Sequence, residues 1–136
     1  MFKKILVPVD LAHNEQAGEM IKLARELGGK SAKIILTHVI NDIPVYAAVE
    51  ISVELLEQTN KWAAKELAAM AKANNITTKP DMRHGSAGSA IVDAANEMKA
   101  DLIIIASHKP GLADYFLGST ASRVVRHAQC PVLVMR

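Results

Sequence analysis

An apolar run over residues 102–105 leads into a loop that ends at Gly118, Ser119 and Thr120. The apolar residues that follow, Ala121, Val124, Val125 and Ala128, have the spacing of one helix face. The first backbone amides of a helix, at the positive end of its dipole, bind phosphate well. The sequence therefore indicates a phosphate site where this loop enters the helix. An ordinary strand-to-helix loop with Ser119 as the N-cap is the alternative.

A carboxylate follows the first apolar run of the chain, residues 5–9. Pro8 removes one donor from the ladder, so strand pairing should stop there and leave Asp10 at the end of the strand. A carboxylate in that position can accept hydrogen bonds from ribose hydroxyls, as acidic groups do in dinucleotide folds. The alternative is an Asp10 that only closes the first turn.

Other residues near these strand ends could assist a nucleotide site. Backbone groups around Val39 could pair with an adenine edge, and Lys109 adds a mobile positive charge near the phosphates. We expect Arg123 and Arg126 on the solvated face of their helix. His38 is expected to be a core or strand-end histidine, because no partner lies at the spacing of metal ligands.

Two glycine-rich segments and two single residues favour structural interpretations. Residues 29–31 resemble the end of a Walker loop, but Arg25 stands where its glycine is needed and the segment follows a helix. The turn over residues 85–89 could bind phosphate, and a flexible turn with a serine cap explains it as well. Cys130 reads as a small core residue and Trp62 as packing.

Strand-like and helix-like segments alternate along the chain with short connections. Strands are expected near residues 5–9, 34–40, 77–84, 102–105 and 132–135, and helices near 14–28 (with Asn14 as N-cap), 49–74, 89–98 and 118–128. Right-handed crossovers then give an α/β fold, a doubly wound five-stranded parallel sheet with helices on both faces. The polar third strand belongs at an edge, which favours the Rossmann-like order 3-2-1-4-5. Ligands bind at the switch between strands one and four in such a sheet, where Asp10 and Ala106 would meet.

The length and composition of the chain limit the classes of function that it can have. The 136 residues indicate a single domain, residues 1–136. The 16 basic and 14 acidic residues include no basic run, which argues against nucleic-acid binding. No apolar run approaches the roughly 20 residues of a membrane span, and no secretion signal is evident. We therefore expect a cytoplasmic protein without a membrane segment.

Several motifs together resemble the universal stress protein family. They are Val7-Pro8-Val9-Asp10, residues 37–40, Ser107-His108, Gly118-Ser119, and Arg126-His127-Ala128 with residues 131–134. The likeness covers essentially the whole chain. Residues 106–110 with 117–119 look most like the small bacterial F/G branch of the family.

The resemblance implies an adenine-nucleotide-binding fold, usually a homodimer, that is induced under stress. Its nucleotide-binding positions correspond to Pro8, Val9, Asp10 and Val39 for adenosine and to Ile105, Ala106, His108, Lys109, Gly118, Ser119 and Thr120 for the phosphates. The implied ligand is ATP, with or without Mg²⁺. ATP-binding members carry two glycines where Ala106 and Lys109 stand here, and eight rather than nine residues then precede Gly118.

Three functional hypotheses remain open. The first is an ATP-binding stress regulator, with at most slow ATP hydrolysis or autophosphorylation, because Asp10 has no paired acidic residue and no base is evident; His108 is expected to bind or to order the loop. The second is a nucleotide-free module that forms a homodimer through the last strand, Val132–Met135. The third is an adenylating or kinase-like enzyme, for which the sequence offers no nucleophile. No catalytic residue and no metal ligand is assigned.

Overall fold

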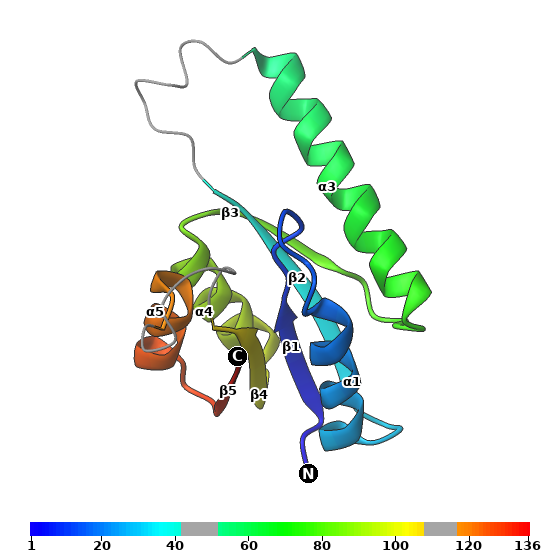
Figure 1. Ribbon diagram of the computed structural model, residues 1–136, viewed down its shortest axis with the longest axis vertical. Helices are drawn as coiled ribbons and strands as arrows, with labels where there is room; N and C mark the ends of the chain where they lie inside the picture. The colour runs from blue at the N-terminus through cyan, green and yellow to red at the C-terminus, as the bar shows by residue number, and fades with distance from the viewer. Residues whose placement is uncertain (42–51, 108–116) are drawn as a thin grey trace.

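A computed structural model of the protein describes residues 1–41, 52–107 and 117–136 (Figure 1). The elements in chain order are β1 (Lys4–Pro8), α1 (Ala17–Gly28), β2 (Lys33–Asn41), α3 (Val53–Ala73), β3 (Asp81–Gly85), α4 (Ala87–Met98), β4 (Leu102–Ala106), α5 (Ser119–His127) and β5 (Val132–Met135).

The strands form one parallel sheet in the order β3-β2-β1-β4-β5, as the sequence predicted. Strands β1 and β4 are continuously apolar because both of their faces are covered. The polar strand β3 lies at one edge and β5 at the other. The order reverses between β1 and β4, so the topological switch falls where it was expected.

Alternate side chains of the sheet pack into two cores. Ile5 and Val7 of β1 face a core that α1 and α3 complete, whereas Leu6 faces a second core closed by α4 and α5. Figure 1 shows these two pairs of helices on opposite sides of the sheet. Described residues at the carboxyl ends of the central strands line a cleft between the two layers, where a ligand can enter.

The starts of three elements differ from the prediction. Helix α1 begins at Ala17 with Gln16 as its N-cap, not Asn14, because the carbonyl of Asn14 accepts the Ala17 N–H in a preceding turn. Helix α3 begins after Ser52, whose hydroxyl accepts the backbone N–H of Leu55. Strand β3 begins at residue 81 rather than 77, since only the later residues pair with β2.

Two apolar side chains that the sequence placed in the core are exposed. Trp62 of α3 is 50% exposed and Val125 of α5 is 46% exposed. Each lies next to a buried residue, Ala63 or Val124, and is turned about 100° away from it around the helix. The amino-terminal half of α3 also extends past the sheet (Figure 1), so it has no core to face.

Cys130 contacts the second core and is half-buried, so it is a partly covered core residue. Burial raises the pKa of its thiol, which keeps the sulfur protonated and unreactive at neutral pH. Across the three described segments, no helix is both long enough and apolar enough to cross a bilayer.

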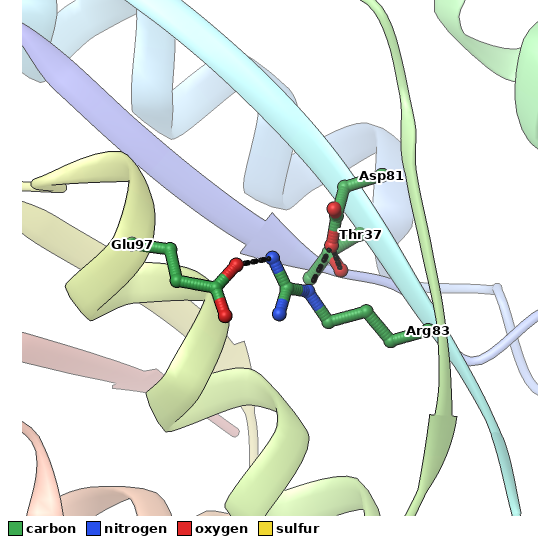
Figure 2. A network of polar contacts seen from close by, with 4 residues as sticks. All are labelled: Thr37, Asp81, Arg83 and Glu97. Carbon is green, nitrogen blue, oxygen red and sulfur yellow. Dashed lines mark hydrogen bonds and ion pairs between the residues drawn. The ribbon is translucent and has the colours of Figure 1, made fainter.

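A polar network joins the edge of the sheet to α4 (Figure 2). The buried hydroxyl of Thr37 donates to Asp81 at 2.5 Å, and Arg83 Nε donates to the same carboxylate at 2.8 Å. Arg83 Nη2 also donates to Glu97 at 2.6 Å. The hydrogen bond from Arg83 lowers the pKa of Glu97, so the carboxylate stays charged and ties α4 to β3.

Candidate nucleotide site at the carboxyl end of the sheet

A cleft of about 1080 Å³ lies at the carboxyl ends of the central strands. Its walls come from the end of β1, the end of β2, the start of α4, the end of β4 and the start of α5. The described residues that the sequence assigned to nucleotide binding line it together: Pro8, Val9, Asp10, Val39, Ile105, Ala106, Gly118, Ser119 and Thr120. His108 and Lys109 lie outside the described residues.

Strand β2 extends beyond the end of β1 at this cleft, so backbone groups of β2 are exposed to the cleft. The Val9 N–H donates to the Thr37 carbonyl at 2.8 Å, and beyond Thr37 only β3 is paired with β2. Alternate residues of a parallel strand direct their backbone groups to opposite neighbours. Because Thr37 faces β1, the N–H and C=O of Val39 face the space where β1 has ended. An adenine edge could meet them there.

His38 holds the end of β1 against β2. Its Nδ1 lies 2.9 Å from the carbonyl oxygen of Val9, so in this tautomer Nδ1 carries the proton and donates it. The side chain is half-buried at the cleft wall. This contact confirms the interpretation of His38 as a strand-end histidine.

Asp10 closes the turn after β1 and also faces the cleft. Its Oδ1 accepts the N–H of Ala12 at 3.0 Å, and its carbonyl accepts the N–H of His13 at 3.0 Å. This is the turn-closing role that the sequence offered as the alternative. The side chain is nevertheless exposed at the cleft, and Oδ2 has no hydrogen bond within the part of the chain that the structure describes. One carboxylate oxygen is therefore available to a ligand.

The start of α5 has no side-chain cap. Gly118 is the N-cap and Ser119 the first helical residue, so the alternative with Ser119 as N-cap is wrong. The first helical bond runs from the Ser122 N–H to the Gly118 carbonyl at 2.8 Å. The amides of residues 119–121 precede that bond and are the donors that a helix start leaves for an anion.

The φ of −58° at Gly118 is open to every L-residue. The backbone conformation therefore does not require glycine at this position. A missing side chain instead leaves room for a group bound against the helix start.

Ser86, Ala87 and Gly88 at the start of α4 also line the cleft, although no site residue was predicted there. The feature of the sequence that pointed to these residues is the glycine-rich turn over residues 85–89. A Cβ at Gly88 would lie 2.8 Å from Cδ of Arg123, so glycine there allows α5 to approach α4 closely.

Two arginines bring positive charge to this side of the cleft. Arg123 and Arg126 are exposed, as predicted, and both line the cleft. Arg123 Nε donates to the Ser89 hydroxyl at 2.8 Å, which holds the guanidinium beside the start of α4. Among the described residues, no group of three His, Cys, Asp or Glu side chains could hold a metal ion.

The model of the universal stress protein family matches residues 1–136. Universal stress protein MJ0531 of Methanocaldococcus jannaschii is 33% identical, over all of this chain and 83% of its own length. Universal stress protein G of Escherichia coli O157:H7 is 32% identical over the full length of both chains.

Two solved structures extend these similarities to the fold. The hypothetical protein MJ0577 superposes with a TM-score of 0.82 at 28% identity, over 99% of this chain and 96% of its own. A universal stress protein described in complex with cAMP superposes with a TM-score of 0.59 at 25% identity, over 99% of this chain and 97% of its own.

Proposed function

The chain belongs to the universal stress protein family, and we propose that it binds an adenine nucleotide, ATP in the first place, as a stress-response regulator. One observation carries the proposal: the carboxylate of Asp10 and the uncapped start of α5 line the same cleft. Those groups suit the two chemically different ends of a nucleotide.

The adenosine would lie at the exit of β1. The backbone N–H and C=O of Val39 provide one donor and one acceptor for an adenine edge, and Oδ2 of Asp10 can accept from a ribose hydroxyl. Pro8 and Val9 supply apolar wall beside them. His38 stabilises this geometry, because its contact with the Val9 carbonyl holds the end of β1 in place.

The phosphates would lie against the start of α5. Ser119 and Thr120 offer amides and hydroxyls at the positive end of the helix dipole. Arg123 and Arg126 add charge from the next helical turn. His108 and Lys109 belong to the proposed phosphate site through the family resemblance alone.

Magnesium, where it accompanies ATP, would be held chiefly by phosphate oxygens and water. Mg²⁺ commonly binds to proteins through one or two carboxylates together with substrate phosphates. Asp10 is an available carboxylate at the cleft, and no three-ligand group occurs among the described side chains. The ion would thus supply charge neutralisation on the phosphates.

A solved structure of a similar protein supports an adenine nucleotide as the ligand. The universal stress protein that is 25% identical to this chain is described in complex with cAMP, an adenine nucleotide. His13, Glu15, His38 and His127 also line the cleft. None of their side chains is hydrogen-bonded to the carboxylate of Asp10 in the described part of the chain, which favours binding over rapid turnover. We expect ligand occupancy to alter contacts with partners in the cytoplasm.

Calorimetric titration of the full chain with ATP and ADP tests the proposal. We expect micromolar ATP binding that weakens at least tenfold in Asp10→Ala. Asp93→Ala, which removes an exposed carboxylate of α4 that does not line the cleft, is the matched control and should bind as the wild type does. No binding at millimolar ATP rejects the proposal.

A nucleotide-free homodimeric module is the second candidate. Strand β5 is an edge strand of the sheet and could pair with a second copy of the chain. Mass spectrometry of the small molecules released from freshly purified protein distinguishes the two functions. A bound adenine nucleotide favours the regulator, and an empty protein that also fails to bind added ATP favours the module.

A further inference from the structure

Four lysines surround a hollow at the amino end of the sheet, opposite to the nucleotide cleft. Lys4 and Lys33 begin β1 and β2, Lys79 precedes β3, and Lys99 follows α4. They line a space of about 410 Å³ together with Ile35, Thr78, Glu97 and Met98. This set shares no residue with the lining of the cleft.

The four lysines outnumber the acids beside them: Glu97 lines the hollow, and the carboxylate of Asp101 accepts the backbone N–H of Lys4 at 3.0 Å. Both ion pairs found among the described residues belong to Arg83, so none of the four lysines is paired there. Glu97 lines the hollow, and its carboxylate binds Arg83 at 2.6 Å (Figure 2). Arg83 also binds Asp81 at 2.8 Å, so two carboxylates share this one guanidinium. Four lysines that line one space repel one another and, with fewer acids beside them, create a local positive potential.

Lys99 occupies a backbone conformation that lysine rarely adopts. It ends α4 at φ 56° and ψ 45°, the left-handed region where glycine or asparagine is usual. The helix dipole favours a cation at this end of α4. That effect explains one positive charge, and it does not explain the three lysines that reach the hollow from other elements.

We propose that this hollow binds a small anion that carries several phosphate groups. Lysine ammonium groups are point charges that bind phosphate oxygens without a fixed orientation, which suits an anion approached from four sides. Convergence of four elements on one space favours a compact anion over an extended acidic peptide, which would need a linear row of charges.

Inorganic triphosphate is the probe, used with the full chain at constant ionic strength. Titration of Ser119→Glu separates the hollow from the cleft, because a carboxylate at the start of α5 repels phosphate there. We expect this variant to bind triphosphate, and we expect binding to weaken at least tenfold when Lys4→Gln and Lys33→Gln are added. Adding Lys61→Gln and Lys65→Gln on α3 removes the same charge and should leave the affinity unchanged.

Amide chemical shifts locate the anion independently of the variants. Triphosphate should move the signals of residues 33 and 99 in the wild-type protein, besides any change at residues 119–120. The proposal is overturned when both lysine pairs weaken binding equally, which is a nonspecific charge effect, or when the Ser119→Glu variant binds no triphosphate. Shifts confined to the start of α5 overturn it as well.

Discussion

The backbone N–H of Gly118 donates to the carbonyl oxygen of Ser107 at 2.7 Å, which sets the start of α5 against the end of β4. The N–H of the buried Ser107 in turn donates to the carbonyl of Met135 at 2.7 Å. Two strand ends and one helix start therefore meet at Ser107. These contacts fix the amides of α5 beside the cleft.

Replacing Gly118 with aspartate should raise stability and weaken phosphate binding at the same time. The residue is an N-cap at φ −58°, so aspartate fits and its carboxylate can accept an amide of the first turn. We expect the free energy of unfolding to rise by about 0.5 kcal/mol. The same carboxylate repels a phosphate, and ATP affinity should fall at least tenfold in calorimetry.

Gly18→Asp is the control for this substitution. It places the same carboxylate in the first turn of α1, where a Cβ meets nothing within 4 Å, and Gly18 does not line the cleft. ATP affinity should stay at the wild-type value. Wild-type affinity in Gly118→Asp would contradict the placement of the phosphates at α5.

The hydroxyl of Thr37 should matter for stability. Thr37 is 0% exposed and donates to Asp81, which also holds Arg83 (Figure 2). Thr37→Val keeps the shape but removes a donor from a half-buried carboxylate, so we expect a loss of about 1–2 kcal/mol in chemical unfolding. Thr59→Val removes a hydroxyl that donates to the carbonyl of Leu55 on the exposed half of α3, and should cost less. Equal losses of stability in the two variants would show that the network around Asp81 does not stabilise the fold.

Asp101 should make the fold sensitive to acid. Burial acts to raise the pKa of Asp101, but the backbone N–H groups of Lys3 and Lys4, at 2.8 and 3.0 Å, outweigh it and lower the pKa. A carboxyl with a lowered pKa in the folded state stabilises the fold above its unfolded pKa of about 3.9, and this stabilisation is lost as the pH falls through the lower folded value.

Asp101→Asn tests this assignment by chemical unfolding at several pH values. The variant should be less stable than the wild type at pH 7, and the difference should shrink below about pH 4. Asp93→Asn removes an exposed carboxylate of α4 and should leave the pH dependence unchanged. A constant difference between Asp101→Asn and wild type over the whole pH range would argue against the shift.

Leu67 and Trp62 of α3 should differ widely in their effect on stability. Leu67 is 0% exposed and lies in the core that α1 and α3 share, whereas Trp62 is 50% exposed. Leu67→Ala should cost about 2–5 kcal/mol because it leaves a cavity. Trp62→Ala, although it removes the larger side chain, should change the free energy of unfolding by only about 0.5 kcal/mol. A large cost at Trp62 would mean that it is covered in solution.

The sheet order was predictable because the composition of three strands indicates their positions. Residues 5–9 and 102–105 are continuously apolar and lie inside, while the polar β3 lies at an edge. Periodicity identifies the buried face of a helix but not how far the helix extends past the sheet. Trp62 was misplaced for that reason, and Val125 was misplaced because it lies beside the true stripe of α5.

The residues that the strand order brings to the switch point were predictable, whereas individual side-chain contacts and helix caps were not. Asp10 and Ala106 follow adjacent strands at the switch point, so their position in one cleft needed no side-chain detail. The contact between Arg83 and Glu97 joins residues 14 apart with no recurring spacing, and no pattern in the sequence marks it. The N-cap at Gln16 was missed because residues 14–17 form a separate turn before the helix.

Val134→Pro tests whether β5 pairs with a second copy of the chain. The bonds from Ile103 N–H to the Pro131 carbonyl and from Ser107 N–H to the Met135 carbonyl show that odd-numbered residues of β5 face β4. Val134 therefore directs its backbone N–H to the open edge, and proline there removes that donor without touching the β4 ladder. We expect light scattering to report a dimer for the wild type and a folded monomer for Val134→Pro. Leu133→Pro, whose lost donor belongs to the β4 ladder, should unfold the edge instead, and a Val134→Pro variant that remains dimeric would move the interface away from β5.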